Sequence, residues 1–257
     1  MTASEHDSVV RRSFEQQVGI FAGDDSPFAR RPASPLAWLE PLEPDMIVLD
    51  VACGAAHVAE QVAPHVRQVV GLDLTPALLE LGAQRLGEAG ITNVLLQEGN
   101  AGELPFLDAS FDLVACRGSL HHFPLPDRQI AEMARVCRPE GRVVASDMVV
   151  TKAAARERFD DLHRSMDPSH AHTLLEAEVA ELLRSTVGPI VYGETSGPFL
   201  IPIDHILSDA ADRDAVMSAL QAELEGGDAT GFDPVVDGDQ ILVSFTSTVV
   251  HATRSSA

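Results

Sequence analysis

The 257-residue sequence predicts an α/β fold with a doubly wound, mostly parallel sheet. Short β-branched runs alternate with segments of helical spacing over about a hundred residues, which is typical of right-handed β-α-β crossovers. These runs contain few polar residues, as strands buried on both faces require. A last run near the C-terminus alternates between apolar and polar residues, which predicts an antiparallel strand at an edge of the sheet.

Strands and helices alternate regularly in the first half of the chain. Pro64 ends the first expected helix, and Thr75 with Pro76 supplies an N-cap and a first-turn proline for the second. We expect strands at 46–52, 66–74, 93–99, 111–117 and 142–150, and helices at 55–64, 76–90 and 127–138.

The second half is less regular. Thr173 and Glu176 predict a capping box for a helix over 174–186, which Gly188 ends. Interrupted helical segments are expected over 204–225. Two further strands are expected, at 190–197 and, as the antiparallel strand, at 241–253.

Charge and composition exclude several classes of function. The chain has 39 Asp and Glu against 18 Lys and Arg, a formal net charge of −21, so nucleic-acid backbones and anionic lipids would repel it. Its three cysteines are too few and too far apart for a disulfide framework or a CxxC metal site. Because no uncharged run is long enough to span a bilayer or to act as a signal peptide, we expect a cytoplasmic protein.

Four loops follow the expected parallel strands at their carboxyl ends, where open α/β sheets bind ligands. Their sequences are DVACGAAHV, GLDLTP, QEGNAGELPF and CRGSLHHF. In the first loop, Ala52 and Gly54 are small enough for the backbone to pass under a ligand, and Asp50 precedes them. A dinucleotide fingerprint fits poorly here, because His57 occupies its third glycine position.

The next two loops carry groups that suit a nucleoside. Asp73, at the end of the second strand, can accept hydrogen bonds from both hydroxyls of a ribose, or it is only a carboxylate near a helix N-terminus. Asn100 and Ala101 can present an amide side chain and a backbone N–H to the edge of a base, or they form an ordinary Asn turn. The first three loops together therefore favour a ligand site.

The four loops together resemble the motifs of class I S-adenosylmethionine-dependent methyltransferases, most closely the small-molecule group related to the ubiquinone and menaquinone C-methyltransferases. VLDVACGAAHVAEQVA is similar to the first motif, VVGLDLTPALLEL to the second and EGNAGELPFLDASFDLV to the third. SLHHFPLPDRQIAEMARVCRPEGRVVASD is similar to the fourth to sixth. The likeness covers about residues 45–150. It implies a seven-stranded, Rossmann-like methyltransferase fold and S-adenosyl-L-methionine as the cofactor.

The resemblance also implies roles for the residues of the first two loops. Asp50 and the backbone of Ala52 and Gly54 hold the methionine end of the cofactor. Asp73 binds the ribose, and Leu74 packs on the adenine.

The remaining loops complete the implied cofactor site. Asn100 and Ala101 address the edge of the adenine, and Arg117 lies near the sulfonium. Ala52 and Ala56 replace the usual first and third glycines of the first motif, and Asn100 replaces a more usual aspartate. These departures put a methyl group close to the cofactor and leave only a neutral oxygen to accept the adenine amino proton, so both could weaken binding.

The resemblance also implies an organisation of the chain. A helical lid occupies residues 1–44, a cofactor-binding Rossmann-like core 45–152, and residues 153–257 complete the sheet and add cap helices over the substrate, all within a single domain. Phe14 and Phe21 fall on the expected lid helix, where they either cover the cofactor or simply dock on the core.

Methyl transfer is an in-line displacement, so the protein mainly contributes proximity and alignment. His121 and His122 stand where a general base could take a proton from the acceptor, or they only pack the loop. His170 and His172 are alternatives from the cap. As half of a metal site these two lack further ligands at a suitable spacing, so no metal is expected.

The sequence thus predicts methyl transfer to a small organic molecule, such as a secondary metabolite or a quinone-like compound. The expected wall of the acceptor site consists of residues 1–35, 151–173 and 195–240. The acceptor is the expected partner, with a homodimer as an option and neither nucleic acid nor membrane.

Two alternatives stay open. The first is a protein that binds the cofactor without methyl transfer, as a pericyclase-like enzyme or a sensor. The second is a nicotinamide-dependent oxidoreductase, which His57 and the lack of a Tyr-x-x-x-Lys pair disfavour.

Overall fold

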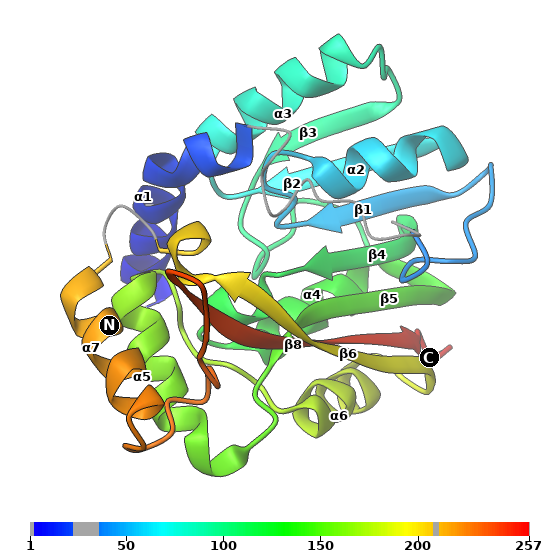
Figure 1. Cartoon of the computed structure of the whole chain (residues 1–257). Helices are drawn as coiled ribbons and strands as arrows, with labels where there is room; N and C mark the ends of the chain where they lie inside the picture. Colours follow the sequence, from blue (N-terminus) through cyan, green and yellow to red (C-terminus); the bar gives the residue numbers. More distant parts are fainter. Residues whose placement is uncertain (1–2, 23–35, 208–210, 257) are drawn as a thin grey trace.

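A computed structural model describes residues 3–22, 36–207 and 211–256 (Figure 1). One twisted sheet runs through the molecule, and helices lie against both of its faces. The segment 23–35 of the expected lid lies outside the described residues, and so does 208–210 of the expected acceptor wall.

The sheet confirms the predicted fold class. Its five parallel strands are followed by β8, which is antiparallel to both of its neighbours, and a short β7 (Val235–Asp237) forms a hairpin with β8. The outermost strand is therefore β6, and β8 lies one place inside the edge. The order is β3 (Val94–Glu98), β2 (Gln68–Asp73), β1 (Ile47–Val51), β4 (Phe111–Arg117), β5 (Cys137–Val149), β8 (Gln240–Thr253) and β6 (Ile190–Pro202).

Burial on both faces explains why the parallel strands are so apolar. Leu113 and Val114 are neighbours on the central strand β4, point to opposite faces and are both fully buried. The face of Val114 is covered by α4 (Pro126–Val136) and α6 (Glu176–Thr186). The face of Leu113 is covered by α2 (His57–Val62) and α3 (Pro76–Glu88).

The remaining helices lie toward the carboxyl ends of the parallel strands. Helix α5 (Arg156–Met166) and α7 (Arg213–Leu224) form their own apolar cluster with residues near the start of β8. Helix α1 (Ala3–Ala22) packs on α3 through a second small cluster that includes Phe14 and Phe21 (Figure 1). These three helices therefore surround the edge of the sheet at which ligands are expected. Short 3-10 turns complete the structure at Ala63–His65, Leu120–His122, Ala153–Ala155 and Ile203–His205.

The predicted start of α6 needs correction, whereas that of α3 is confirmed. Helix α6 begins at Glu176, and the carboxylate that accepts from the N-cap backbone belongs to Glu178, which is 2.9 Å from Leu175 N. Thr173 does not cap this helix, because its N–H donates to Asp160. Thr75 does occupy the N-cap position of α3, but its side chain makes no cap hydrogen bond.

The loop between β1 and α2 holds two alanines in a conformation that favours glycine. Ala52 has a φ of 55° and Ala56 a φ of 61°, in the left-handed region where a Cβ is strained. Nearby, α3 approaches this loop so closely that a Cβ on Gly82 would lie 3.1 Å from the Ala55 carbonyl carbon. The loop is thus held in a glycine-like shape although alanine replaces the two glycines of the family pattern.

We predict that Ala52→Gly raises the free energy of unfolding by about 1 kcal/mol, because glycine adopts this conformation without a steric cost. Denaturant unfolding of both proteins measures the change. Ala83→Gly is the control, since Ala83 is exposed inside α3 and glycine should there cost about 1 kcal/mol. Destabilisation by both substitutions would contradict a strained Ala52.

Candidate functional site

A cavity of about 480 Å³ opens at the carboxyl ends of the parallel strands. Its volume is in the range of small-molecule and cofactor sites. All ten site residues that the sequence predicts line this one cavity: Asp50, Ala52, Gly54, Asp73, Leu74, Asn100, Ala101, Arg117, His121 and His122. They come from four loops that the sheet order brings side by side.

Asp73 joins the first two loops. Its Oδ2 accepts from Gly54 N and its Oδ1 from Thr75 N, both at 2.8 Å. Burial raises the pKa of Asp73, although these hydrogen bonds favour the charged form. Both carboxylate oxygens thus already hold the two loops in place, and the cavity-lining carboxylate is a strong acceptor for a ligand hydroxyl.

Asp50 is a buried carboxylate without a full set of partners. Its Oδ2 has no hydrogen-bond partner among the described residues. Burial raises the pKa of Asp50 to about 7, while a hydrogen bond from the Ala59 backbone and the charge of Arg117 oppose this rise. The pKa of Arg117 is itself lowered by burial. A cationic ligand group near Asp50 would favour its charged form.

The third loop meets helix α1. Asn100 Nδ2 donates to Asp7 Oδ2 at 2.8 Å, and Asn100 Oδ1 accepts from Gly102 N at 2.7 Å. The neutral oxygen that could accept a proton from an adenine thus already accepts one hydrogen bond from the loop itself.

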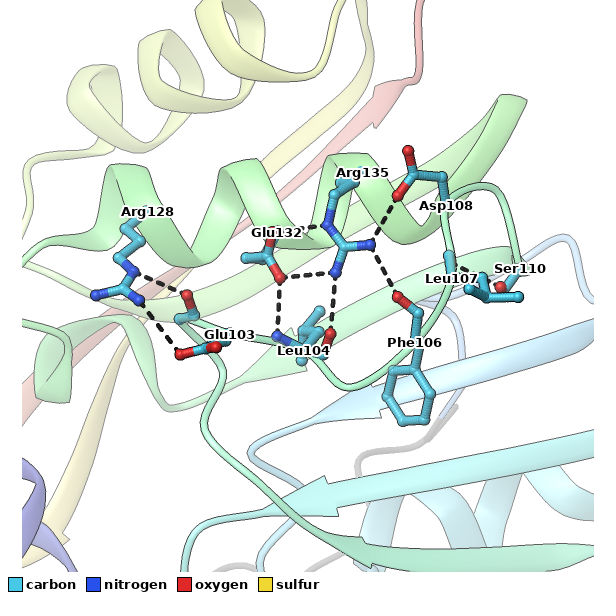
Figure 2. Close-up of polar contacts among 10 residues, drawn as sticks. Glu103, Leu104, Phe106, Leu107, Asp108, Ser110, Arg128, Glu132 and Arg135 are labelled. Atoms are coloured by element: carbon cyan, nitrogen blue, oxygen red, sulfur yellow. Dashed lines mark hydrogen bonds and ion pairs between the residues drawn. The ribbon is translucent and has the colours of Figure 1, made fainter.

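Helix α4 fixes the rest of this loop, as Figure 2 shows. Arg135 donates to the carbonyl oxygens of Leu104 (2.9 Å) and Phe106 (2.8 Å) and pairs with Glu132, which in turn accepts from Leu104 N (2.8 Å). These hydrogen bonds to Arg135 lower the pKa of Glu132. Asn100 and Ala101 therefore stand at the start of a rigid segment.

His121 forms a dyad with Asp147 of β5. Its Nδ1 lies 2.7 Å from Asp147 Oδ1, and its backbone N donates to Asp147 Oδ2 at 3.1 Å. Burial disfavours the imidazolium, but the adjacent carboxylate outweighs this and raises the pKa of His121. With Nδ1 directed at Asp147, the cavity-lining ring keeps Nε2, which has no partner among the described residues. This is the arrangement of a general base.

His122 has a different environment. Its Nδ1 is 3.1 Å from both Ser169 O and Ser169 Oγ, and its carbonyl oxygen lies 2.8 Å from His6 Nε2. Burial, together with the neighbouring His121, lowers the pKa of His122 to about 4. Its hydrogen bonds thus connect three segments of the chain and involve no carboxylate.

The two histidines considered as alternatives do not line the cavity. His170 is buried with its Nε2 2.8 Å from Asp160 Oδ1, and the backbone N of His172 donates to His121 O at 3.2 Å. Among the described residues, no group of three or more His, Cys, Asp or Glu side chains could hold a metal ion.

Sequence reasoning missed several residues on the acceptor side. His163 and Asp167 lie within the predicted wall at 151–173 but were not singled out; His163 comes from the buried face of α5, and Asp167 is the C-cap residue of that helix. Gln129, on the side of the third loop, was missed because it lies on α4; a Cβ on Gly102 would be 3.4 Å from its Nε2. The stretch Phe245, Thr246, Ser247 was missed because an alternating strand gives no signal for a binding role.

The cavity wall contains buried polar atoms that need a partner. Among the described residues, Asp50 Oδ2, His57 Nε2, Ser119 Oγ and Gln129 Oε1 have none, and all four residues line the cavity. Unpaired buried polar atoms cost free energy, so the part of the wall that contains them fits the polar groups of a ligand better than an apolar group.

Comparison with known proteins finds methyltransferases that are similar to part of this chain. Residues 49–145 match the family model described as methyltransferase domain. A Bacillus subtilis (strain 168) relative, named uncharacterized methyltransferase YcgJ, is 37% identical over 124 residues, which are 48% of this chain and 49% of the relative. A demethylmenaquinone methyltransferase of Listeria welshimeri is 40% identical over 104 residues, which are 39% of this chain and 44% of the relative. The chain spans about half the length of the curated relatives it matches.

The likeness in fold extends further than the likeness in sequence. The crystal structure of the YcgJ protein covers 96% of this chain and 99% of its own, with a TM-score of 0.71 at 22% identity. The comparisons confirm the resemblance that the motifs predict.

Within the part of the chain that the structure describes, no helix is long and apolar enough to span a bilayer.

Proposed function

We propose, from the methyltransferase-domain match of residues 49–145 and the cavity that this segment helps to line, that the protein transfers a methyl group from S-adenosyl-L-methionine to a small acceptor. The observation that supports this best is that all eight residues expected to hold the cofactor line one cavity, in the order in which the cofactor needs them.

That order follows from the sheet. Asn100 stands at the end of β3, Asp73 at the end of β2 and Asp50 at the end of β1, and these strands are consecutive neighbours. An adenine, a ribose and an amino-acid tail laid across the three ends would therefore meet an amide, a diol-binding carboxylate and a carboxylate for the ammonium group. Ala52 and Gly54 would let the tail lie against the backbone. Arg117 follows at the end of β4.

When bound, the cofactor supplies an electrophilic methyl group. His121 would take the proton of the acceptor through Nε2, because its Nδ1 is directed at Asp147. Asp147 would stabilise the imidazolium that forms and hold the ring in place, as a positioning residue. His122 would have a structural role, since its Nδ1 contacts Ser169.

The acceptor side of the cavity favours an apolar molecule without phosphate. Arg117 is the only Lys or Arg among the described residues that line the cavity. Five carboxylates oppose it, those of Asp7, Asp50, Asp73, Asp147 and Asp167. The apolar lining includes Phe14, Phe123, Met148, Ile201, Ile206 and Phe245. A quinone-like or phenolic compound fits this lining, and an anionic phosphate ester would be repelled.

The function is tested by binding and by label transfer. We expect calorimetry to show binding of S-adenosylhomocysteine and none of NADH. With methyl-labelled cofactor, label should pass to neutral phenols or quinols and not to their phosphate esters. Binding of NADH alone would refute the proposal, and cofactor binding without transfer to any member of a wide acceptor library would support the alternative of a non-transferring protein.

Binding of S-adenosylhomocysteine should weaken about tenfold from pH 8 to pH 6, because Asp50 with a pKa of about 7 must be ionised to hold the ammonium group. Asp50→Asn should bind the ligand more weakly, by about tenfold, and lose this pH dependence. Calorimetry at four pH values measures both. An unchanged pH dependence in the variant would show that another group titrates.

For an acceptor that gains label in the transfer experiment, His121→Ala should lower kcat by about a hundredfold or more, and His122→Ala should lower it by less than about tenfold. In the parent, kcat/KM should rise with pH through a pKa above 6.5, since the neutral ring is the base. Asp147→Asn should lower kcat and move the rise in kcat/KM to lower pH, because the imidazolium loses its carboxylate. Asp228→Asn, an exposed change, is the control. If kcat/KM of the Asp147 variant rises at the same pH as that of the parent, Asp147 does not stabilise the imidazolium.

A further inference from the structure

We infer that Asp7, on helix α1, is the residue that reads the amino group of the adenine. This inference rests on the proposed function and adds a cofactor contact from outside the matched domain. The observation that carries it is the hydrogen bond of 2.8 Å between Asn100 Nδ2 and Asp7 Oδ2 on the wall of the cavity.

The third loop alone provides a poor acceptor. The side-chain oxygen of Asn100 already accepts from Gly102 N at 2.7 Å and, because it is neutral, it is a weaker acceptor than a carboxylate. The side-chain nitrogen of Asn100 can only donate, and the adenine amino group is also a donor. Asn100 by itself therefore offers the amino group only a neutral oxygen that already accepts one hydrogen bond.

Asp7 supplies the carboxylate at the same place. It lines the cavity, it is half-buried, and its Oδ1 has no hydrogen-bond partner among the described residues. Asn100 holds the other oxygen, Oδ2, and so orients the carboxylate. An oriented carboxylate with one free oxygen accepts strongly from an amino group.

Helix α1 is fixed in this position by contacts on three sides. His6 Nε2 lies 2.8 Å from His122 O, Arg11 pairs with Glu98 at the end of β3, and Ser13 donates to Asp167 at 2.9 Å. Because Asp7 is part of this helix and lines the cavity, binding of the adenine would add a further contact to the helix.

The test compares S-adenosylhomocysteine with S-inosylhomocysteine, in which an oxygen replaces the amino group. Calorimetry on the full chain measures the affinity of each of the two ligands for the parent and for Asp7→Ala. We expect the parent to prefer the adenine ligand by about tenfold or more, since a charged hydrogen bond is replaced by two facing acceptors. Asp7→Ala should bind the adenine ligand about tenfold more weakly and lose the preference. Glu15→Ala, exposed on the same helix, should match the parent.

The outcomes separate the inference from the proposed function. If Asp7→Ala weakens both ligands equally and keeps the preference, Asp7 only anchors the helix and the inference fails. If the parent binds both ligands equally, the amino group is not read, and the inference fails while cofactor binding stands. If the parent binds neither ligand, the proposed function itself fails.

Discussion

The site depends on the two hydrogen bonds that Asp73 accepts, from Gly54 N and Thr75 N. They tie the loop after β1 and the start of α3 to the end of β2, and so help to hold the backbone under the cavity in shape. The same carboxylate is the expected ribose ligand, so one side chain serves the structure and the binding site. Its buried position makes the charged form costly, and the two N–H donors offset that cost.

Much of this could be predicted from the sequence. The order of strands and helices up to β5, the antiparallel last strand and the residues at the four strand ends follow from periodicity and motifs. The capping of α6 could not be predicted, because Thr173 N donates to Asp160 on a different helix. The approach of Asp7 to Asn100 was also out of reach, since 93 positions separate them and only tertiary packing joins them.

The paired histidines show why residue type alone is a poor guide to a role. His121 and His122 are adjacent and equally buried, yet one contacts a carboxylate and the other a serine. The first pKa is raised and the second is lowered, so the two rings differ in charge over the same range of pH. The turn at Leu120–His122 places one ring against Asp147 of β5 and the other against Ser169, and these different neighbours create the difference.

Strand β6 is the outer edge of the sheet, and Val191, Phe199 and Leu200 are exposed on it. Such an edge can template pairing between molecules and so lead to aggregation. Here the register shifts between Ser196 and Phe199, and Pro198 lacks an N–H to donate. A second strand could therefore add to only part of β6 before its hydrogen-bond ladder is interrupted, which protects a long, apolar edge from uncontrolled polymerisation.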